Sequence, residues 1–219
     1  MDRSTRPQIK AVILDYGEVL CYPPTEEEMG RMAEVFGVGA VPFRQLWNRN
    51  RLAYDRGDLS PDDYWSGLAK EAGTQPAPEQ VAQLRQWDLE MWGRENPTMV
   101  VWLKQIHAAG IKTALLSNMP HEMIGYVRRK FSWLAHFDHQ TFSAEVNLIK
   151  PDRAIYEHSL RGVGATASEA LFVDDKEQNV EGARAVGMSA IRFQSITQLI
   201  DDLRRLDFPI EPAPVSAKR

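Results

Sequence analysis

Short apolar runs along the chain alternate with longer segments of helical periodicity. The runs AVIL (11–14), TALL (113–116) and ALFV (170–173) are too short for helices and lack polar alternation. Such runs are typical of parallel strands that are buried on both faces. A fourth run, SAIRF (189–193), follows a helix-like segment. The four runs therefore predict the strands of a parallel sheet.

Segments with helix-start and helix-stop signals lie between these runs. Residues 97–110 and 151–164 each begin with Pro and end with Gly, the residues favoured at those helix ends. Residues 120–131 and 176–187 also have a helical pattern. A β-α-β-α alternation is typical of an open α/β fold. We therefore expect a doubly wound, Rossmann-like core.

Residues 22–93 interrupt the alternation with four helix-like segments and no strand-like run. In one of them, Ser60 precedes Pro61, which predicts an N-cap followed by a first helical turn. We interpret this region as a helical cap inserted after the first strand of the core. The expected division is a core of residues 1–21 and 94–208, a cap of residues 22–93 and a Pro-rich, mobile tail of residues 209–219.

Composition excludes several classes of function. The formal net charge is −4, and acidic and basic residues are mixed along the chain, so no basic stripe indicates a nucleic-acid binder. No apolar run approaches the ~20 residues of a membrane span. Cys21 is the single cysteine, which excludes a disulfide within the chain and favours a reducing compartment. We expect a cytoplasmic protein, as a monomer or homodimer.

Each of the first three predicted strands stops at residues with useful chemistry. Asp15 follows the first strand, Ser117 and Asn118 end the second, and Asp174 and Asp175 end the third. The carboxyl ends of parallel strands meet at one edge of a sheet, where ligands bind in such folds. Three carboxylates in one crevice repel one another unless a cation lies among them. Oxygen donors without a Cys or His cluster suit Mg²⁺.

Lys150, directly before Pro151 and a helix start, adds a compact positive charge that can reach the same crevice. A carboxylate nucleophile, a metal ion, a hydroxyl donor and a lysine together indicate a phosphoryl-transfer site. Aspartate can act as the nucleophile through an aspartyl-phosphate. The substrate would be a small phosphorylated molecule.

Four motifs, in order along nearly the whole chain, resemble those of the haloacid dehalogenase-like hydrolase superfamily. The chain is similar to the branch that contains sugar-phosphate phosphatases and the N-terminal phosphatase domain of epoxide hydrolases. The motifs are DYGEV (15–19), LLSN (115–118), IKPDRAIYEHSL (149–160) and LFVDDKEQNVEGARAVG (171–187). The inserted segment resembles the helical cap that some family members carry between the first two motifs.

The resemblance implies a role for each metal-site residue. Asp15 would be the nucleophile and a Mg²⁺ ligand, and Gly17 would offer its backbone carbonyl to the metal. Asp175 would be a direct metal ligand and Asp174 a supporting one. Asn179 is a candidate for positioning this acidic loop.

The resemblance also implies substrate contacts. Ser117 and Asn118 would hydrogen-bond the phosphoryl oxygens, and Lys150 would order the nucleophile and neutralise charge. The cap segment 47–60 is rich in arginine and aromatic residues. From it we select Arg49 as a candidate for a second anionic group of the substrate, with Arg51 and Arg56 as alternatives. The other reading is that the aromatics form helix core and the arginines face solvent.

Gly17 is the main departure from the family pattern, which has a second aspartate there. That aspartate is the general acid and base, and such help is worth about 10²–10⁴-fold in rate. Glu18 is a poor substitute if the backbone is extended, since its side chain would then point to the opposite side. A substrate with a good leaving group would need the acid less.

The predicted function is Mg²⁺-dependent hydrolysis of a small phosphate monoester, a sugar phosphate included, through an aspartyl-phosphate at Asp15. A 2-haloacid dehalogenase is one alternative, because it uses the same aspartate and needs neither metal nor second acid. The intact pair Asp174 and Asp175 argues against it. A catalytically weakened relative that binds a phosphorylated ligand or a protein is the other alternative.

Overall fold

The apolar strand runs pair side by side in a five-stranded sheet, which the computed structural model shows within described residues 8–213. All strand pairs are parallel, and the order is β3-β2-β1-β4-β5. The strands are β1 (Ala11–Leu14), β2 (Lys112–Ser117), β3 (His139–Phe142), β4 (Ala170–Asp174) and β5 (Ser189–Arg192).

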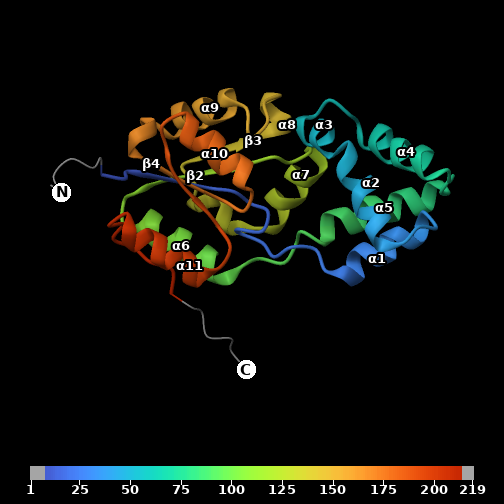
Figure 1. Cartoon of the computed structure of the whole chain (residues 1–219), viewed down its shortest axis with the longest axis horizontal. Coiled ribbons are helices and arrows are strands. Elements are labelled where there is room, and N and C mark those ends of the chain that lie inside the picture. The colour runs from blue at the N-terminus through green and yellow to red at the C-terminus, as the bar shows by residue number, and fades with distance from the viewer. Residues whose placement is uncertain (1–7, 214–219) are drawn as a thin grey trace.

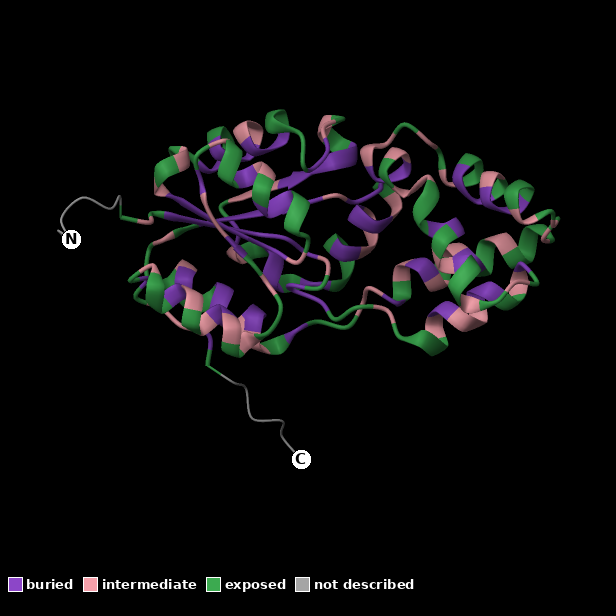
Figure 2. Cartoon of the chain, in the orientation of Figure 1, coloured by how far each residue is buried: buried purple, intermediate pink, exposed green. Residues whose placement is uncertain are grey.

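The central strand lacks polar alternation because both of its faces are covered. Val12 and Leu14 pack in one hydrophobic cluster with residues of α6 (Pro97–Ala108) and α11 (Ile196–Arg205), and Ala11 and Ile13 pack in another with residues of α9 (Arg153–Val163). Figure 2 shows the central strands as buried throughout. The predicted doubly wound α/β fold is confirmed. Strand β3 was not predicted, because its sequence HQTF contains a single strongly apolar residue.

Helices lie on both sides of the sheet, with α6 and α11 on one side and α9 and α10 on the other (Figure 1). The core helices are α6 (Pro97–Ala108), α7 (His121–Lys130), α8 (Ser143–Val146), α9 (Arg153–Val163), α10 (Glu177–Ala185) and α11 (Ile196–Arg205), with 3₁₀ turns η2 (Ser132–His136) and η3 (Ala167–Glu169).

A second lobe, made entirely of helices, lies between β1 and α6 in the chain and at the far right of Figure 1. Its helices are α1 (Glu26–Val35), α2 (Ala40–Arg49), α3 (Arg51–Arg56), α4 (Pro61–Ala72) and α5 (Pro78–Glu90). They enclose their own hydrophobic cluster, which includes Phe36, Phe43 and Trp65. We call this lobe the cap.

Local signals explain most of the cap's helix ends. The Ser60 hydroxyl accepts a hydrogen bond from the Asp63 backbone N–H, as the sequence predicts for an N-cap. The segment 41–57, expected as one helix, is two helices. The helix breaks at Asn50, whose φ and ψ are −107° and 12°.

The cap is attached to the core at more than its two chain connections. Ser143 Oγ in α8 donates to the Asp55 carbonyl of α3. Close by, Asn147 Nδ2 donates to the Arg56 carbonyl at 3.2 Å. A further hydrogen bond, 3.0 Å long, joins the Tyr54 hydroxyl to Glu122 of α7. Helix α3 is therefore fixed to the core at several points.

The expected tail begins on the core surface. The Ile210 carbonyl accepts a hydrogen bond of 2.9 Å from Trp102 Nε1 of α6, while residues 214–219 lie outside the described residues. No helix in the described range 8–213 combines the length and the apolar character needed to cross a membrane.

Candidate active site

The register of the sheet brings the polar strand ends together. Leu14 of β1 lies level with Leu115 of β2 and with Val173 of β4. The next residues along β1 and β4, Asp15 and Asp174, are therefore neighbours at the carboxyl edge. Since β1 lies between β2 and β4, this edge is where the strand order reverses, the usual ligand site of doubly wound sheets.

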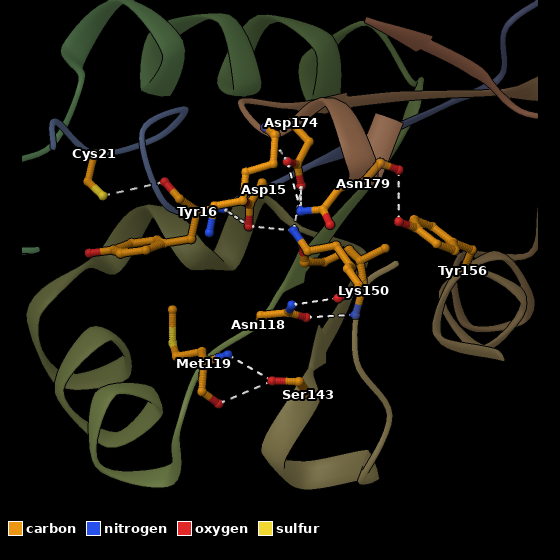
Figure 3. A network of polar contacts seen from close by, with 12 residues as sticks. Asp15, Tyr16, Cys21, Asn118, Met119, Ser143, Lys150, Tyr156, Asp174 and Asn179 are labelled. Carbon is orange, nitrogen blue, oxygen red and sulfur yellow. Dashed lines mark hydrogen bonds and ion pairs between the residues drawn. The ribbon is translucent and has the colours of Figure 1, made fainter. Parts of the chain in front are cut away.

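Lys150 connects the two carboxylates (Figure 3). Its Nζ lies 2.8 Å from Asp15 Oδ1 and 2.6 Å from Asp174 Oδ2, and it donates to the Leu116 carbonyl at 2.9 Å. The side chain is 1% exposed. Burial opposes the charge on this ammonium, but the two carboxylates outweigh burial and raise the pKa of Lys150. The lysine therefore stays charged beside Asp15 and Asp174.

Two amide side chains hold this arrangement in place. Asn118 Oδ1 accepts from the Lys150 backbone N–H at 2.9 Å, and its Nδ2 donates to the Lys150 carbonyl at 3.0 Å. Asn179 Nδ2 lies within 3.1 Å of both oxygens of Asp174, which also accepts from the Lys176 N–H. Asn118 thus fixes the backbone of Lys150, and Asn179 fixes Asp174 in the acidic loop.

Asp15 has one fixed oxygen and one free oxygen. Oδ1 accepts from the Tyr16 N–H at 2.7 Å and pairs with Lys150. No hydrogen bond within residues 8–213 reaches Oδ2. Burial is the main cause that raises the pKa of Asp15, and Lys150 opposes it. A carboxylate held in this way can present Oδ2 as a nucleophile or a metal ligand.

The acidic residues also suit a divalent cation. Oxygens of Asp15, Asp174 and Asp175 all lie within 4.8 Å of one another. Burial raises the pKa of Asp175 to about 7, and the charges of Asp15 and Asp174 add to the effect. A hard cation would relieve this repulsion, and the all-oxygen donors match Mg²⁺. Both Asp174 oxygens already accept hydrogen bonds, so Asp15 and Asp175 are the residues best able to ligate.

A cavity of about 390 Å³ opens above these residues, between the core and the cap. Every site residue predicted in the core, including Gly17 and the buried Ser117, lines it, except Asp174, which lies beneath. The cavity is lined from the cap and its connections by Pro24, Met29, Arg44, Trp47, Asn48, Arg51, Leu52, Asp55 and Trp92.

The structure does not bring Arg49 to this cavity. Its Nη1 pairs with Glu71 of α4 at 2.7 Å, and its side chain is mostly exposed. Arg49 is two residues from Trp47, about 200° around the same helix, so the two side chains leave opposite faces. Arg51 and Arg44 line the cavity instead, whereas Arg56 pairs with Asp58.

The expected orientation of Glu18 is wrong. Its φ is +56°, in the left-handed region, so the chain turns directly after Asp15 and is not extended. Glu18 consequently lines the same cavity as the nucleophile. The motif offered no signal for this turn, because left-handed residues are usually glycine or asparagine.

Trp92 occupies the space beside Gly17. A Cβ added at Gly17 would lie 3.5 Å from Cζ3 of the indole. The Tyr16 hydroxyl donates to the Trp92 carbonyl at 2.6 Å, which fixes this connection between cap and core. Sequence reasoning missed Trp92, because nothing in the local pattern links residue 92 to the first motif. A side chain at position 17 would thus begin in van der Waals contact with the indole.

The fold, the three strand ends that carry motifs, the lysine before α9 and the buried Asp–Lys–Asp network define a class of hydrolase. A family model described as haloacid dehalogenase-like hydrolase matches residues 4–187, and the chain belongs to this family.

Individual relatives add detail. The chain is 29% identical, over 198 residues, to the sesquiterpene phosphatase astK of Aspergillus oryzae, covering 90% of this chain and 96% of that protein. A HAD family enzyme of Bacteroides thetaiotaomicron, crystallised with magnesium and inorganic phosphate, matches with a TM-score of 0.66 and 20% identity, covering 85% of this chain and 94% of its own. The L-2-haloacid dehalogenase of Xanthobacter autotrophicus matches with a TM-score of 0.63 and 23% identity, covering 94% and 85%. The two solved structures show a shared fold.

Proposed function

We propose that this hydrolase is a Mg²⁺-dependent phosphatase that cleaves a small phosphate monoester through an aspartyl-phosphate at Asp15. One observation carries the proposal: Asp15 Oδ1 is fixed by Lys150 and the Tyr16 N–H, no hydrogen bond within residues 8–213 reaches Oδ2, and Asp15 lines the cavity together with Asp175. The similarity to a protein named as a sesquiterpene phosphatase supports phosphoryl chemistry.

The residues divide the reaction between them. Asp15 Oδ2 attacks phosphorus in line with the ester oxygen, so the Oδ2–P bond forms while the P–O bond to the leaving group breaks. The Lys150 ammonium offsets the charge brought to the nucleophile, and the Ser117 hydroxyl is placed to donate to a phosphoryl oxygen. Mg²⁺, held by Asp15, Asp175 and the Gly17 carbonyl, would supply further charge neutralisation.

The second half of the reaction returns Asp15 to its starting state. Water attacks phosphorus, the P–Oδ2 bond breaks, and inorganic phosphate leaves. Gly17 carries no group that can protonate the departing alcohol or activate this water, and Glu18, which lines the cavity, is one residue away from the position of the family's acid. We therefore expect turnover to depend strongly on the acidity of the leaving alcohol, with aryl and acyl phosphates favoured over simple alkyl esters.

The dehalogenase alternative fits the acidic residues less well. Displacement of halide by Asp15 needs no cation, so Asp175 would only add repulsion beside a nucleophile that burial already disfavours as an anion. The phosphatase reaction explains the same carboxylates, because a divalent cation would bind them and offset their mutual repulsion.

Phosphate release from phenyl phosphate, with Mg²⁺ or with EDTA, tests the proposal. We expect Mg²⁺-dependent turnover that falls at least about 10³-fold in Asp15→Asn, since nucleophile loss removes the covalent route. Asp201→Asn, on the exposed side of α11, is the matched control and should retain full activity. Acid quenching followed by peptide mapping should locate phosphate on Asp15.

Equal release by wild type and Asp15→Asn would contradict the assignment of the nucleophile. Halide release from 2-chloropropionate in EDTA, with no ester turned over, would instead select the dehalogenase.

A further inference from the structure

The cap side of the active-site cavity differs in chemistry from the core side. Resting on the proposed phosphatase function, we propose that the cavity selects phosphate monoesters with an apolar, uncharged substituent, which the cap holds against Trp47, Leu52 and Trp92. This choice excludes sugar phosphates and substrates with a second anionic group from the preferred class.

Apolar side chains from separate elements converge on this part of the cavity. Leu52 of α3 is 54% exposed, although it lines the cavity. Exposed leucine of this kind gains stability when a ligand covers it, at roughly 25 cal/mol per Å² of apolar area. The apolar lining comprises Pro24, Met29, Trp47, Leu52 and Trp92 from the cap and its connections, with Met119, Pro120 and Met123 from the core.

The arginine on α3 that lines the cavity is already committed within the cap. Arg51 Nε pairs with Asp55 Oδ1 at 2.9 Å, and its Nη1 donates to both oxygens of Asp88 at 3.0 and 3.1 Å. The guanidinium also stacks over Trp47, 4.5 Å from the ring centroid. A substrate anion would have to compete with two buried carboxylates for this group.

The remaining charges leave no cationic subsite on the cap. Arg44 pairs with Glu26 at 2.7 Å, so the two lining arginines face three carboxylates in all. Burial is the main cause that raises the pKa of Asp55, to about 6, so this lining carboxylate is ionised at pH 7.5. An anionic substituent would therefore have to displace a carboxylate from one of these arginines, which disfavours binding.

The core side supplies two lining cations. Lys150 is paired with Asp15 and Asp174, and Lys176 comes directly after Asp175. The charge of Lys176 opposes the rise in pKa at three carboxylates, Asp15, Asp55 and Asp175. Lys176 therefore lies among carboxylates near the proposed phosphoryl position. For a sugar hydroxyl, Asn48 is the uncommitted polar side chain that the cap offers. On the cap side, five of the nine lining residues are apolar and three of the four polar ones, Arg44, Arg51 and Asp55, are already paired, which favours a hydrocarbon substituent there.

A series of 4-alkylphenyl phosphates, from methyl to pentyl, tests the proposal at almost constant leaving-group acidity. We expect kcat/KM to rise about two- to fourfold for each added methylene until the cavity is filled. In 4-(2-carboxyethyl)phenyl phosphate, a charged group of similar size should lower kcat/KM below that of the 4-methyl compound. Glucose 1-phosphate should be a weaker substrate than any aryl ester.

Two variants with the same chemical change locate the effect. Leu52→Asp places a charge in the proposed apolar lining and should flatten the chain-length dependence. Val41→Asp is the control, because Val41 is 70% exposed on α2 and lies outside the cavity lining. It should leave the dependence unchanged. A flat series in the wild type, or equal effects of the two variants, would overturn the proposal.

A binding measurement distinguishes failure of this proposal from failure of the proposed function. Calorimetry with 4-alkylbenzylphosphonates and Mg²⁺ measures the same chain-length dependence without turnover. If no ester is hydrolysed but phosphonate affinity rises with chain length, the phosphatase assignment fails and the apolar selectivity stands. If esters are hydrolysed and both series are flat, only the selectivity fails. Preference for the carboxyethyl compound would show a cationic subsite and also contradict it.

Discussion

The two sides of the cavity use charged residues in opposite ways. On the core side, Lys150 holds Asp15 and Asp174 while leaving one Asp15 oxygen free. On the cap side, Arg51 is saturated by Asp55 and Asp88.

Both groups are buried ion networks, so burial of charge alone does not distinguish a reactive site from a structural one. The difference lies in the number of carboxylates around each cation. In the core network, Asp15, Asp174 and Asp175 hold oxygens within 4.8 Å of one another beside one lysine, an arrangement that suits a metal ion, whereas in the cap network two carboxylates share one arginine. Changes in the core network should therefore alter chemistry, and changes in the cap network should alter stability.

Lys150→Met is the sharpest test of the core side and should have the largest effect. It leaves Asp15 and Asp174 buried without a counter-charge, which should cost about 3–5 kcal/mol of unfolding free energy. Removal of a charge-stabilising donor should also lower kcat about 10²–10³-fold. Urea unfolding and phenyl phosphate turnover measure both effects. Lys104→Met, on the exposed side of α6, should change neither quantity. Retained turnover in Lys150→Met would contradict the role of the core network in catalysis.

Asp175→Asn tests whether the open side of the core network is a cation site. At about a hundred times its Kd, Mg²⁺ should stabilise the wild type by about 2.7 kcal/mol and the variant far less. The pKa of Asp175 is raised to about 7, so its ionised form destabilises the metal-free fold, and stability falls as pH rises from about 4 to 7. In EDTA at pH 8, the variant should thus be more stable than the wild type. Equal Mg²⁺ shifts in thermal unfolding would rule out Asp175 as a ligand.

Asp55→Asn tests the cap side. The pKa of Asp55 is raised from 3.8 to about 6, mainly by burial. The folded protein therefore binds more protons than the unfolded chain between about pH 4 and 6, and this contribution to stability is lost as pH rises through that window. Relative to Asp55→Asn, the wild type should lose about 2–3 kcal/mol between pH 4.5 and 7. Parallel urea-unfolding curves for the two proteins would contradict this. The variant's kcat should change far less than that of Lys150→Met.

Gly17→Asp tests the contact between the two sides at Trp92 and should have the smallest effect on kcat and stability. The Trp92 ring lies 3.5 Å from the added Cβ, an ordinary van der Waals contact, so the fold should accept the substitution while the indole restricts the rotamers open to the carboxylate. We expect no gain in kcat for the single variant. Gly17→Asp combined with Trp92→Ala has room for the carboxylate and should turn over alkyl phosphates faster than Trp92→Ala alone. A gain in the single variant would show that the indole does not block the acid.

Most of the core could be predicted because its signals are local. The apolar runs of β1, β2 and β4 mark buried strands, and each runs directly into the residues that meet at the sheet edge. Lys150 was predictable from its place before a helix and from the resemblance to a known family. Strand β3 was not predictable, because its burial comes from neighbouring elements and not from its own sequence.

The cap-side residues were not predictable for a different reason. The orientation of Arg49 depends on where α2 ends. The sequence around Asn50 gives no clear signal for that helix end. The contact between Gly17 and Trp92 joins positions 75 residues apart, and no periodicity reports on such a pair. Local patterns thus identified the core-side residues of the cavity, whereas its cap-side lining depends on packing between distant segments.

The attachment of α3 to α8 has a mechanical consequence. Two chain connections alone form a hinge about which a lid can rotate, but an anchor away from that axis removes this freedom. Hydrogen bonds at Ser143 and Asn147 provide such an anchor. We expect the cap to stay fixed relative to the core, so that substrate and product exchange without rotation of the cap. The hydrocarbon part of a bound ester would then lie between two surfaces that do not move apart.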